Sequence, residues 1–274
     1  MRMLRSFLPV GQGAFYREAF MTDTDKKIHN VVYDCGSTSK NLIISAIDRE
    51  FRKEDTVDAV FISHFHSDHI NGLKHLIEHC NVKNIFFPYL EKKEKGFTKL
   101  FCLLEQEDED VFVILNNMEN PEKWGTWGRK LKNSEAGIWF VSTETTETLK
   151  SEKKPKEDNG NKVVLSGQDC SSEIFGSELS EIKDVAWEYI PFNFRQEEKI
   201  QWIKKILTTF GKEEGVELPE YNDYTSFFKE VKDNKELLKK WKEALNGKDG
   251  NTNSMVVFSG SCKNNLTYKL LKCR

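Results

Sequence analysis

Three histidines and an aspartate fall within the seven residues SHFHSDH, at positions 63–69. The side chains with metal-binding atoms are His64, His66, Asp68 and His69. Imidazole nitrogens and carboxylate oxygens are ligands for zinc, manganese and iron in proteins. The whole chain has six histidines, so half of them lie in this one segment. We therefore expect a site for a divalent metal, most simply zinc, with manganese or iron as alternatives.

The spacing predicts how these donors are grouped. His64 and His66 are two residues apart, and alternate side chains of an extended segment lie on the same face. Asp68 and His69 begin a helical pattern, so they can be directed at a second point nearby. We expect one or two metal ions, and a pair of ions would share one water molecule.

A buried strand is expected to hold this cluster. The apolar run AVFIS at 59–63 predicts that strand, and INGLKHLIEHC at 70–80 has the spacing of an amphipathic helix. The cluster therefore lies at the carboxyl end of a buried strand, where open α/β sheets tend to place their ligand sites.

The remaining elements alternate between strand and helix. Two strands around a Gly-Gln-Gly turn are expected within residues 2–20, and a buried strand at 29–37. Further helices are expected at 39–52, 97–118, 196–211 and 223–245, and further strands at 82–90, 137–143, 162–167, 184–194, 251–260 and 265–271. This alternation assigns the chain to the α/β class.

The composition argues against some classes of function. The 274-residue chain has a formal net charge of -3 and a pI of about 6.1, which gives no general attraction to nucleic acid or to an anionic membrane. No apolar run approaches the roughly 18 residues that a membrane-spanning helix needs, so we expect a cytoplasmic protein. The six cysteines show no paired spacing and are expected to be free thiols. A small-molecule or nucleotide-type substrate fits these features, and the oligomeric state is not predicted.

Four segments resemble the metallo-β-lactamase superfamily. SHFHSDHINGL at 63–73 resembles its H-x-H-x-D-H signature and the helix that follows. FLPVGQGA at 7–14 resembles the opening strand and turn, and VVYDCGS at 31–37 resembles the D-x-G end of a strand. NTNSMVVFSG at 251–260 resembles the Asn-x-x-Ser strand of the branch related to the hydrolase domain of bacterial DNA-uptake proteins.

This resemblance implies an αββα sandwich with the metal site at one edge of its sheets. His64 and His66 would then bind one metal, and Asp68 with His69 a second. Asp34 would orient the ligands or the turn without touching the metal. Asp68 would also be the catalytic residue that orients the attacking water. The implied activity is metal-dependent hydrolysis of an ester, amide or phosphodiester, of which we favour the phosphodiester.

The resemblance fails in the second half of the chain. The family takes further ligands there, commonly an aspartate after a Gly-Asp strand and a later histidine, whereas no histidine follows His79. Either the chain is a truncated form of a longer protein, or it is a degenerate member with half a site. We favour truncation, because an incomplete sheet would leave an unpaired edge and an exposed core.

We interpret residues 1–274 as a single domain of this kind, incomplete at the C-terminus. The N-terminal half with the metal motif would span 1–95, a mixed segment with a helical insertion 96–250, and the start of the C-terminal half 251–274. Whether the chain is an active enzyme stays open. The alternatives are a non-catalytic or degenerate metal-binding or interaction protein, and a lactonase or thioester hydrolase of the same fold.

Other conspicuous residues are expected to have ordinary roles. His29 stands at the beginning of a strand and is expected to be exposed. His75 and His79 are four residues apart and should lie on a partly solvated face of one helix. Trp124 and Trp127 are expected to pack in the core or to anchor a loop.

Overall fold

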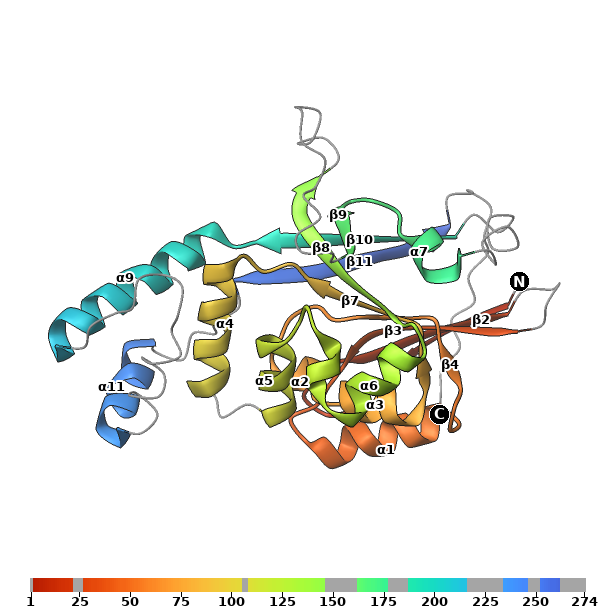
Figure 1. The fold of residues 1–274 in the computed structure, drawn as a ribbon, viewed down its shortest axis with the longest axis horizontal. Coiled ribbons are helices and arrows are strands. Elements are labelled where there is room, and N and C mark those ends of the chain that lie inside the picture. The colour runs from red at the N-terminus through yellow and green to blue at the C-terminus, as the bar shows by residue number, and fades with distance from the viewer. Residues whose placement is uncertain are drawn as a thin grey trace.

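The computed structural model of the chain describes residues 2–21, 27–104, 108–145, 162–176, 187–215, 234–245 and 252–261. Its main layer is a seven-stranded sheet that has helices on one face and a two-stranded sheet on the other (Figure 1). The α/β class expected from the sequence is confirmed.

The seven-stranded sheet combines antiparallel and parallel strands in the order β1-β2-β3-β5-β7-β8-β9. β1, β2 and β3 pair antiparallel, and every pairing from β3 to β9 is parallel. The parallel strands therefore bring their carboxyl ends to one edge of the sheet. The strands are β1 (Arg2–Phe7), β2 (Phe15–Met21), β3 (Ile28–Cys35), β5 (Ala59–Phe61), β7 (Asn84–Pro88), β8 (Gly137–Thr145) and β9 (Lys162–Ser166).

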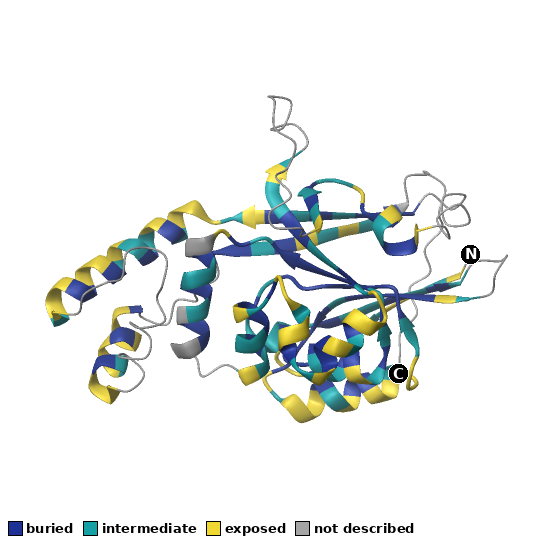
Figure 2. Cartoon of the chain, viewed as in Figure 1, coloured by how far each residue is buried: buried dark blue, intermediate teal, exposed yellow. Residues whose placement is uncertain are grey.

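Helices cover one face of this sheet and enclose the main core. They are α1 (Lys40–Glu50), α2 (Ser67–Ile70), α3 (Leu73–His79), α5 (Glu109–Asn116), the 3-10 helix η1 (Pro121–Trp124) and α6 (Thr126–Asn133). Figure 2 shows that the strands beneath them are largely buried and that the outer sides of the helices are exposed. Trp124 and Trp127 both lie in this core, in agreement with the expectation of core packing.

A smaller layer covers the other face of the sheet. It consists of β10 (Trp187–Arg195), β11 (Asn253–Ser261) and the short helix α7 (Ser171–Phe175). β10 and β11 pair antiparallel. Tyr189 and Met255 from this layer join Phe61 and Phe86 of the main sheet in a second core. Because side chains alternate along a strand, each central strand contributes to both cores.

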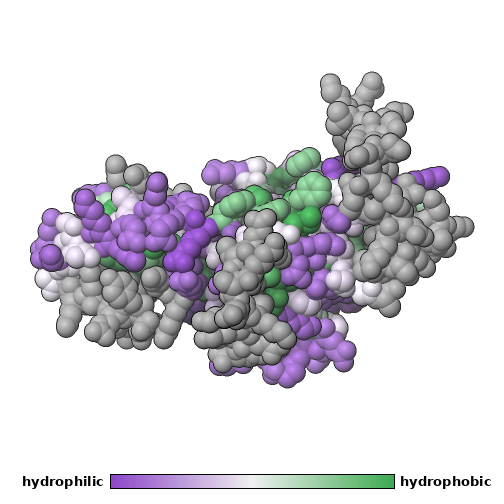
Figure 3. All heavy atoms as spheres, turned by 90° about the horizontal axis from the view of Figure 1, so that it is seen from above, coloured by the Kyte–Doolittle hydropathy of each residue, from purple (hydrophilic) through white to green (hydrophobic). Residues whose placement is uncertain are grey.

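The outward side of the two-stranded sheet is apolar. Phe194, Val256 and Phe258 are each about half exposed. Figure 3 views the molecule from this side and shows hydrophobic surface between the hydrophilic helices and the grey atoms. Within the described residues, this sheet therefore buries one of its two faces and leaves the other open to solvent.

A separate helical layer lies beyond one end of the sheets (Figure 1). It consists of α4 (Lys92–Leu104), α9 (Glu197–Glu214) and α11 (Lys235–Leu245). Phe97, Phe210 and Trp241 meet in its core, and the ring centroids of Phe210 and Trp241 are 4.9 Å apart. In the part of the chain that the structure describes, no helix combines the length and the apolar character needed to cross a membrane.

Most of the predicted elements are present, with some exceptions. The helices η1, α6 and α7 were not predicted from the sequence. The short strands β4 (Thr56–Val57) and β6 (Asn81–Val82), which pair with each other, were not predicted because two residues show no periodicity. The predicted strand at 265–271 and residues 223–233 of a predicted helix lie outside the described residues.

His29 is buried within β3, so the expectation that it would be exposed was wrong. The alternation of side chains along the strand turns it toward the second core. Its ring stacks on Phe20 with 5.1 Å between the centroids, and its Nδ1 lies 3.6 Å from Oδ2 of Asp58. Stacking and a carboxylate neighbour therefore account for a buried histidine.

Candidate metal centre

Asp34 lies near the end of β3 with its backbone in the left-handed region, at a φ of 56°. This region is uncommon for residues other than glycine, and aspartate tolerates it better than most. The side chain is buried, and its two oxygens accept hydrogen bonds from the backbone N–H and the hydroxyl of Ser63, each at 2.7 Å. These bonds tie the end of β3 to the segment that leads from β5 into the histidine cluster.

The same carboxylate sets the orientation of two histidines. Oδ2 of Asp34 lies 2.8 Å from Nδ1 of His69. Because a carboxylate only accepts, Nδ1 of His69 carries the hydrogen, which leaves the lone pair on Nε2. The Ser63 hydroxyl donates to Asp34, so it accepts from Nδ1 of His64, which is 2.9 Å away. Both rings therefore present Nε2 as the nitrogen that can bind a metal.

Asp34 also influences the charge of His69. Burial lowers the pKa of His69, but the hydrogen bond and the negative charge of Asp34 outweigh burial, with a smaller contribution from Asp68. The pKa of His69 is therefore raised above its ordinary value of 6.5. A metal that binds Nε2 has to compete with a proton, as is general for histidine ligands.

The structure brings three of the four predicted ligands into one group. His64, Asp68 and His69 each place a ligand atom within 4.8 Å of the others. The ring centroids of His64 and His69 are 3.8 Å apart. His66 adjoins this group, with its ring centroid 4.9 Å from that of His64 and its plane nearly perpendicular. Imidazoles and a carboxylate at this spacing fit a divalent cation such as zinc.

The turn GQG lies against the backbone of this group. The N–H of Ala14 donates to the carbonyls of Gly36 and Asp68, at 3.1 and 3.0 Å. A Cβ atom on Gly13 would lie 2.4 Å from the carbonyl oxygen of Gly36, and a Cβ atom on Gly36 would lie 2.3 Å from the backbone nitrogen of His69. Three backbone segments therefore meet here without room for side chains, so these glycines do more than form the tight turn expected from the sequence.

Three polar residues that support the centre were missed in the sequence. Ser63 is one, and its position between a buried strand and the first histidine was the available signal. Asn71 and Ser37 are the others: Asn71 Oδ1 accepts from the N–H of Ser37 at 3.1 Å, and Asn71 Nδ2 donates to its carbonyl at 2.7 Å. This pair joins the end of α2 to the segment after β3. Polar residues in turns are too common to have indicated it.

β11 reaches the centre from the second sheet. The backbone N–H of Met255 donates to the carbonyl of Ser63 at 2.9 Å, and the carbonyl of Met255 accepts from the hydroxyl of Tyr33 at 2.6 Å. Asn253 and Ser254 come directly before Met255. The start of β11 therefore lies beside the residue that precedes the histidine cluster.

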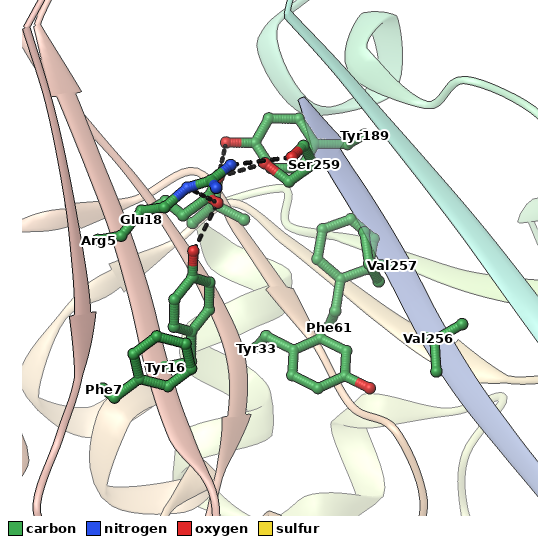
Figure 4. Close-up of a pocket in the computed structure, with 11 residues that line it drawn as sticks. Arg5, Phe7, Tyr16, Glu18, Tyr33, Phe61, Tyr189, Val256, Val257 and Ser259 are labelled. Atoms are coloured by element: carbon green, nitrogen blue, oxygen red, sulfur yellow. Dashed lines mark hydrogen bonds and ion pairs between the residues drawn. The ribbon is translucent and has the colours of Figure 1, made fainter. Parts of the chain in front are cut away.

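A cavity of about 380 Å³ lies between β11 and the main sheet (Figure 4). At one end of it, the buried carboxylate of Glu18 lies 3.0 Å from Nε of Arg5 and accepts hydrogen bonds from the hydroxyls of Tyr16, Tyr189 and Ser259. Both oxygens of Glu18 are thus satisfied within the protein. Nothing in the sequence indicated that this glutamate is buried.

The rest of the cavity lining is apolar or aromatic: Phe7, Val31, Tyr33, Phe61, Val256 and Val257. Tyr33 precedes Asp34 in β3, so the cavity is adjacent to the candidate centre through that strand.

The four described cysteines, Cys35, Cys80, Cys102 and Cys170, are buried free thiols, as expected. Burial raises the pKa of the Cys35 thiol, which keeps it in its unreactive form.

Comparison with known proteins points to the segment that carries the cluster. Residues 27–145 match the model of the Metallo-beta-lactamase superfamily. Among solved structures, the chain is similar to a beta-lactamase domain protein from Burkholderia ambifaria, with 23% sequence identity and a TM-score of 0.24. That match covers 37% of this chain and 31% of the Burkholderia chain, which is less than a third of its length. No curated protein matches the chain.

Proposed function

We propose, from the similarity of residues 27–145 to the Metallo-beta-lactamase superfamily, that this chain is a metal-dependent hydrolase. The observation that carries the proposal is the donor group: ligand atoms of His64, Asp68 and His69 lie within 4.8 Å of one another. Asp34 supports it by orienting His69. Zinc is the proposed cation, since imidazole nitrogen and carboxylate oxygen are among its usual ligands.

The residues of the centre would have different roles in hydrolysis. A bound cation would supply a water molecule of lowered pKa, near ~7, and a positive charge beside the bond to be cleaved. His64 and His66 would hold one cation, and Asp68 with His69 a second. Asp68 is the proposed catalytic residue, because its carboxylate is partly exposed, with 27% of the side chain accessible, and can accept a hydrogen bond from the attacking water.

We favour a phosphodiester as the substrate. Residues 251–260 resemble the Asn-x-x-Ser strand of the branch related to bacterial DNA-uptake proteins. The N–H of Met255 in this strand is hydrogen-bonded to Ser63, so the resembling segment adjoins the donor group. A lactone or a thioester is the second class of substrate that the same donors would suit. A non-catalytic protein would retain the cation without cleaving either.

The proposal is tested by assaying two substrates side by side. Protein stripped of metal and reloaded with zinc or manganese is given bis(p-nitrophenyl) phosphate and, separately, p-nitrophenyl acetate. We expect cleavage of the phosphodiester by the loaded protein alone. Asp68→Asn should slow this reaction at least about 100-fold, the lower end of what a positioned base contributes.

The outcomes separate the three classes. Cleavage of the acetate alone would contradict the phosphodiester proposal and favour a lactone or thioester as the substrate. Cleavage of neither compound, with the metal content measured and full, would contradict the hydrolase proposal. His66→Ala should bind less metal than the wild-type protein, and unchanged metal content in that variant would remove His66 from the proposed ligands.

A further inference from the structure

A second group of metal-binding atoms lies between the C-terminal ends of α1 and α3. Asp48 of α1, with His75 and His79 of α3, each place one ligand atom within 4.8 Å of the others. Asp48 is exposed, and the two histidines are partly buried, with 29% and 18% of their side chains accessible. None of the three belongs to the donor group of the candidate metal centre.

The packing of α1 on α3 produces this group. Ile47 is buried beneath α1, and Leu76 and Ile77 are buried beneath α3. Residues four apart lie one above the other on a helix, so His75 and His79 share one flank of α3. The oxygen Oδ1 of Asp48 faces both rings, at 2.7 Å from Nε2 of His75 and 3.4 Å from Nδ1 of His79.

The hydrogen bond of His79 determines which of its ring nitrogens can bind a metal. Nε2 of His79 lies 2.9 Å from the carbonyl oxygen of Phe51. A carbonyl only accepts, so Nε2 carries the hydrogen and Nδ1 of the neutral ring carries a lone pair. That lone pair would face Oδ1 of Asp48, which is also an acceptor. The contact becomes favourable with a proton on Nδ1 or with a metal ion between the two atoms.

His75 adds a third donor atom to this place. Its Nε2 lies at hydrogen-bond distance from the same oxygen of Asp48, and its ring stacks on that of His79 with 5.7 Å between the centroids. In a tetrahedral zinc site with bonds of about 2.0–2.1 Å, neighbouring ligand atoms are about 3.3 Å apart. The two separations from Asp48, 2.7 and 3.4 Å, require only small shifts to reach that value. Metal-bound histidines also commonly donate their other N–H to a backbone carbonyl, as His79 does.

We infer that Asp48, His75 and His79 form a second binding site for a divalent cation of the zinc class, with water completing its coordination. The cation would join the last turn of α1 to two successive turns of α3, the second of which ends the helix. Its charge would lie at the C-terminal ends of both helices, where the helix dipoles favour a cation. This site is independent of the proposed hydrolase activity.

The site is tested by counting metal equivalents in the 274-residue chain. Metal-free protein is titrated with zinc, and separately with cobalt, whose visible absorption reports the ligands. The double variant His75→Ala/His79→Ala should bind one equivalent less than the wild-type protein. Asp48→Asn, which changes one exposed side chain, should lose the same equivalent. Glu78→Gln, exposed on the same helix, is the matched control and should bind as the wild-type protein does.

Other outcomes are equally informative. His66→Ala should lose metal from the candidate centre and keep the equivalent held by His75 and His79, so the two sites fail separately. Equal metal content in the wild-type protein, the folded double variant and Asp48→Asn would overturn this site. If circular dichroism shows that the double variant is unfolded, the metal contents of Asp48→Asn and Glu78→Gln are compared instead. Equal contents in these two variants would overturn the site.

Discussion

Nδ1 of His69 and Oδ2 of Asp34 lie 2.8 Å apart, so a residue in β3 sets the tautomer of a proposed metal ligand in α2. Asp34 is almost inaccessible to solvent, whereas about a quarter of the His69 side chain is exposed. Two hydrogen bonds from Ser63 hold the carboxylate independently of His69. Asp34 is therefore a positioning residue for the donor group.

Asp34→Asn should weaken zinc binding about 10–100-fold, the usual effect of removing a partner that orients a metal ligand. Asparagine tolerates the left-handed backbone of this position, so the fold should be retained. Its NH₂ group, however, would face the N–H of His69. The measurement is a competition titration against a chromophoric chelator. Asp55→Asn, at a partly buried aspartate that accepts from the N–H of Arg52, should bind zinc as the wild-type protein does.

Gly36→Ala should destabilise the protein by about 3 kcal/mol, at the upper end of the cost of overpacking. The new Cβ would lie 2.3 Å from the backbone nitrogen of His69, and backbone atoms cannot rotate away as a side chain can. Gly215→Ala is the comparison. Gly215 has a φ of 67° but nothing within 4 Å of the added Cβ, so its cost should be about 1 kcal/mol. Urea unfolding of both variants measures the difference, and equal losses would contradict the close approach at Gly36.

The donor group could be predicted from the sequence because its members are neighbours in the chain. The four donors lie within six consecutive residues directly after a buried strand, so the short length of chain between them keeps them close in space. They are His64, His66, Asp68 and His69. An orienting role for Asp34 was expected from the family resemblance alone. The contacts of Ser63 and Met255 could not be predicted, because these residues become neighbours of Asp34 and of each other's strands only when distant strands are placed side by side. The residue pattern within one strand does not indicate which distant strand will lie beside it.

The fold likewise includes elements that could be predicted from the sequence and buried residues that could not. α1 was recognised because burial of one face leaves a helical period in its residues, and β7 because it is a short, buried and largely apolar run. The burial of His29 and Glu18 left no such pattern. Both are polar residues on strands, and only the second layer of β10, β11 and α7 covers them.

Glu18→Gln should lower the free energy of unfolding by about 2 kcal/mol, the typical loss for hydrogen bonds to a buried charged group. Glu18 in β2 binds Tyr189 of β10 and Ser259 of β11, so its charge links the two sheets. Amide hydrogen exchange in β10 and β11 should accelerate in the variant. Glu54→Gln, at an exposed ion pair with Lys130, should change stability by less than about 0.5 kcal/mol. Unaltered exchange in β10 and β11 would show that Glu18 does not couple the sheets.

Asp58→Asn should destabilise the protein at pH 7 by about 2 kcal/mol, because Asp58 is a buried carboxylate with charged and polar partners. Burial raises its pKa, but the neighbouring His29 ring, the charge of Lys83 and the N–H of Asn30 together outweigh burial. The pKa of Asp58 is therefore lowered from its ordinary value of 3.8. Urea unfolding at pH 7 measures the loss.

The pH dependence of that loss has a defined sign. A carboxylate with a lowered pKa in the folded state binds its proton less readily than in the unfolded chain, so its contribution is present above pH 3.8 and disappears as the pH falls through the folded pKa. The wild-type protein and Asp58→Asn should therefore approach each other in stability as the pH falls from 3.8 through the lower pKa that Asp58 has in the folded protein. A gap that stays constant over that pH range would count against an ionised Asp58 in the folded protein.

The hydrogen bond from Met255 to Ser63 also imposes an order on assembly. During synthesis the histidines leave the ribosome early, whereas β11 is among the last strands to emerge. Contacts between such distant residues form slowly, because a long loop has to close first. A nascent chain halted before residue 252 would carry the whole histidine cluster. The carbonyl of Ser63, directly before the cluster, would lack its hydrogen bond from the N–H of Met255 until β11 is synthesised.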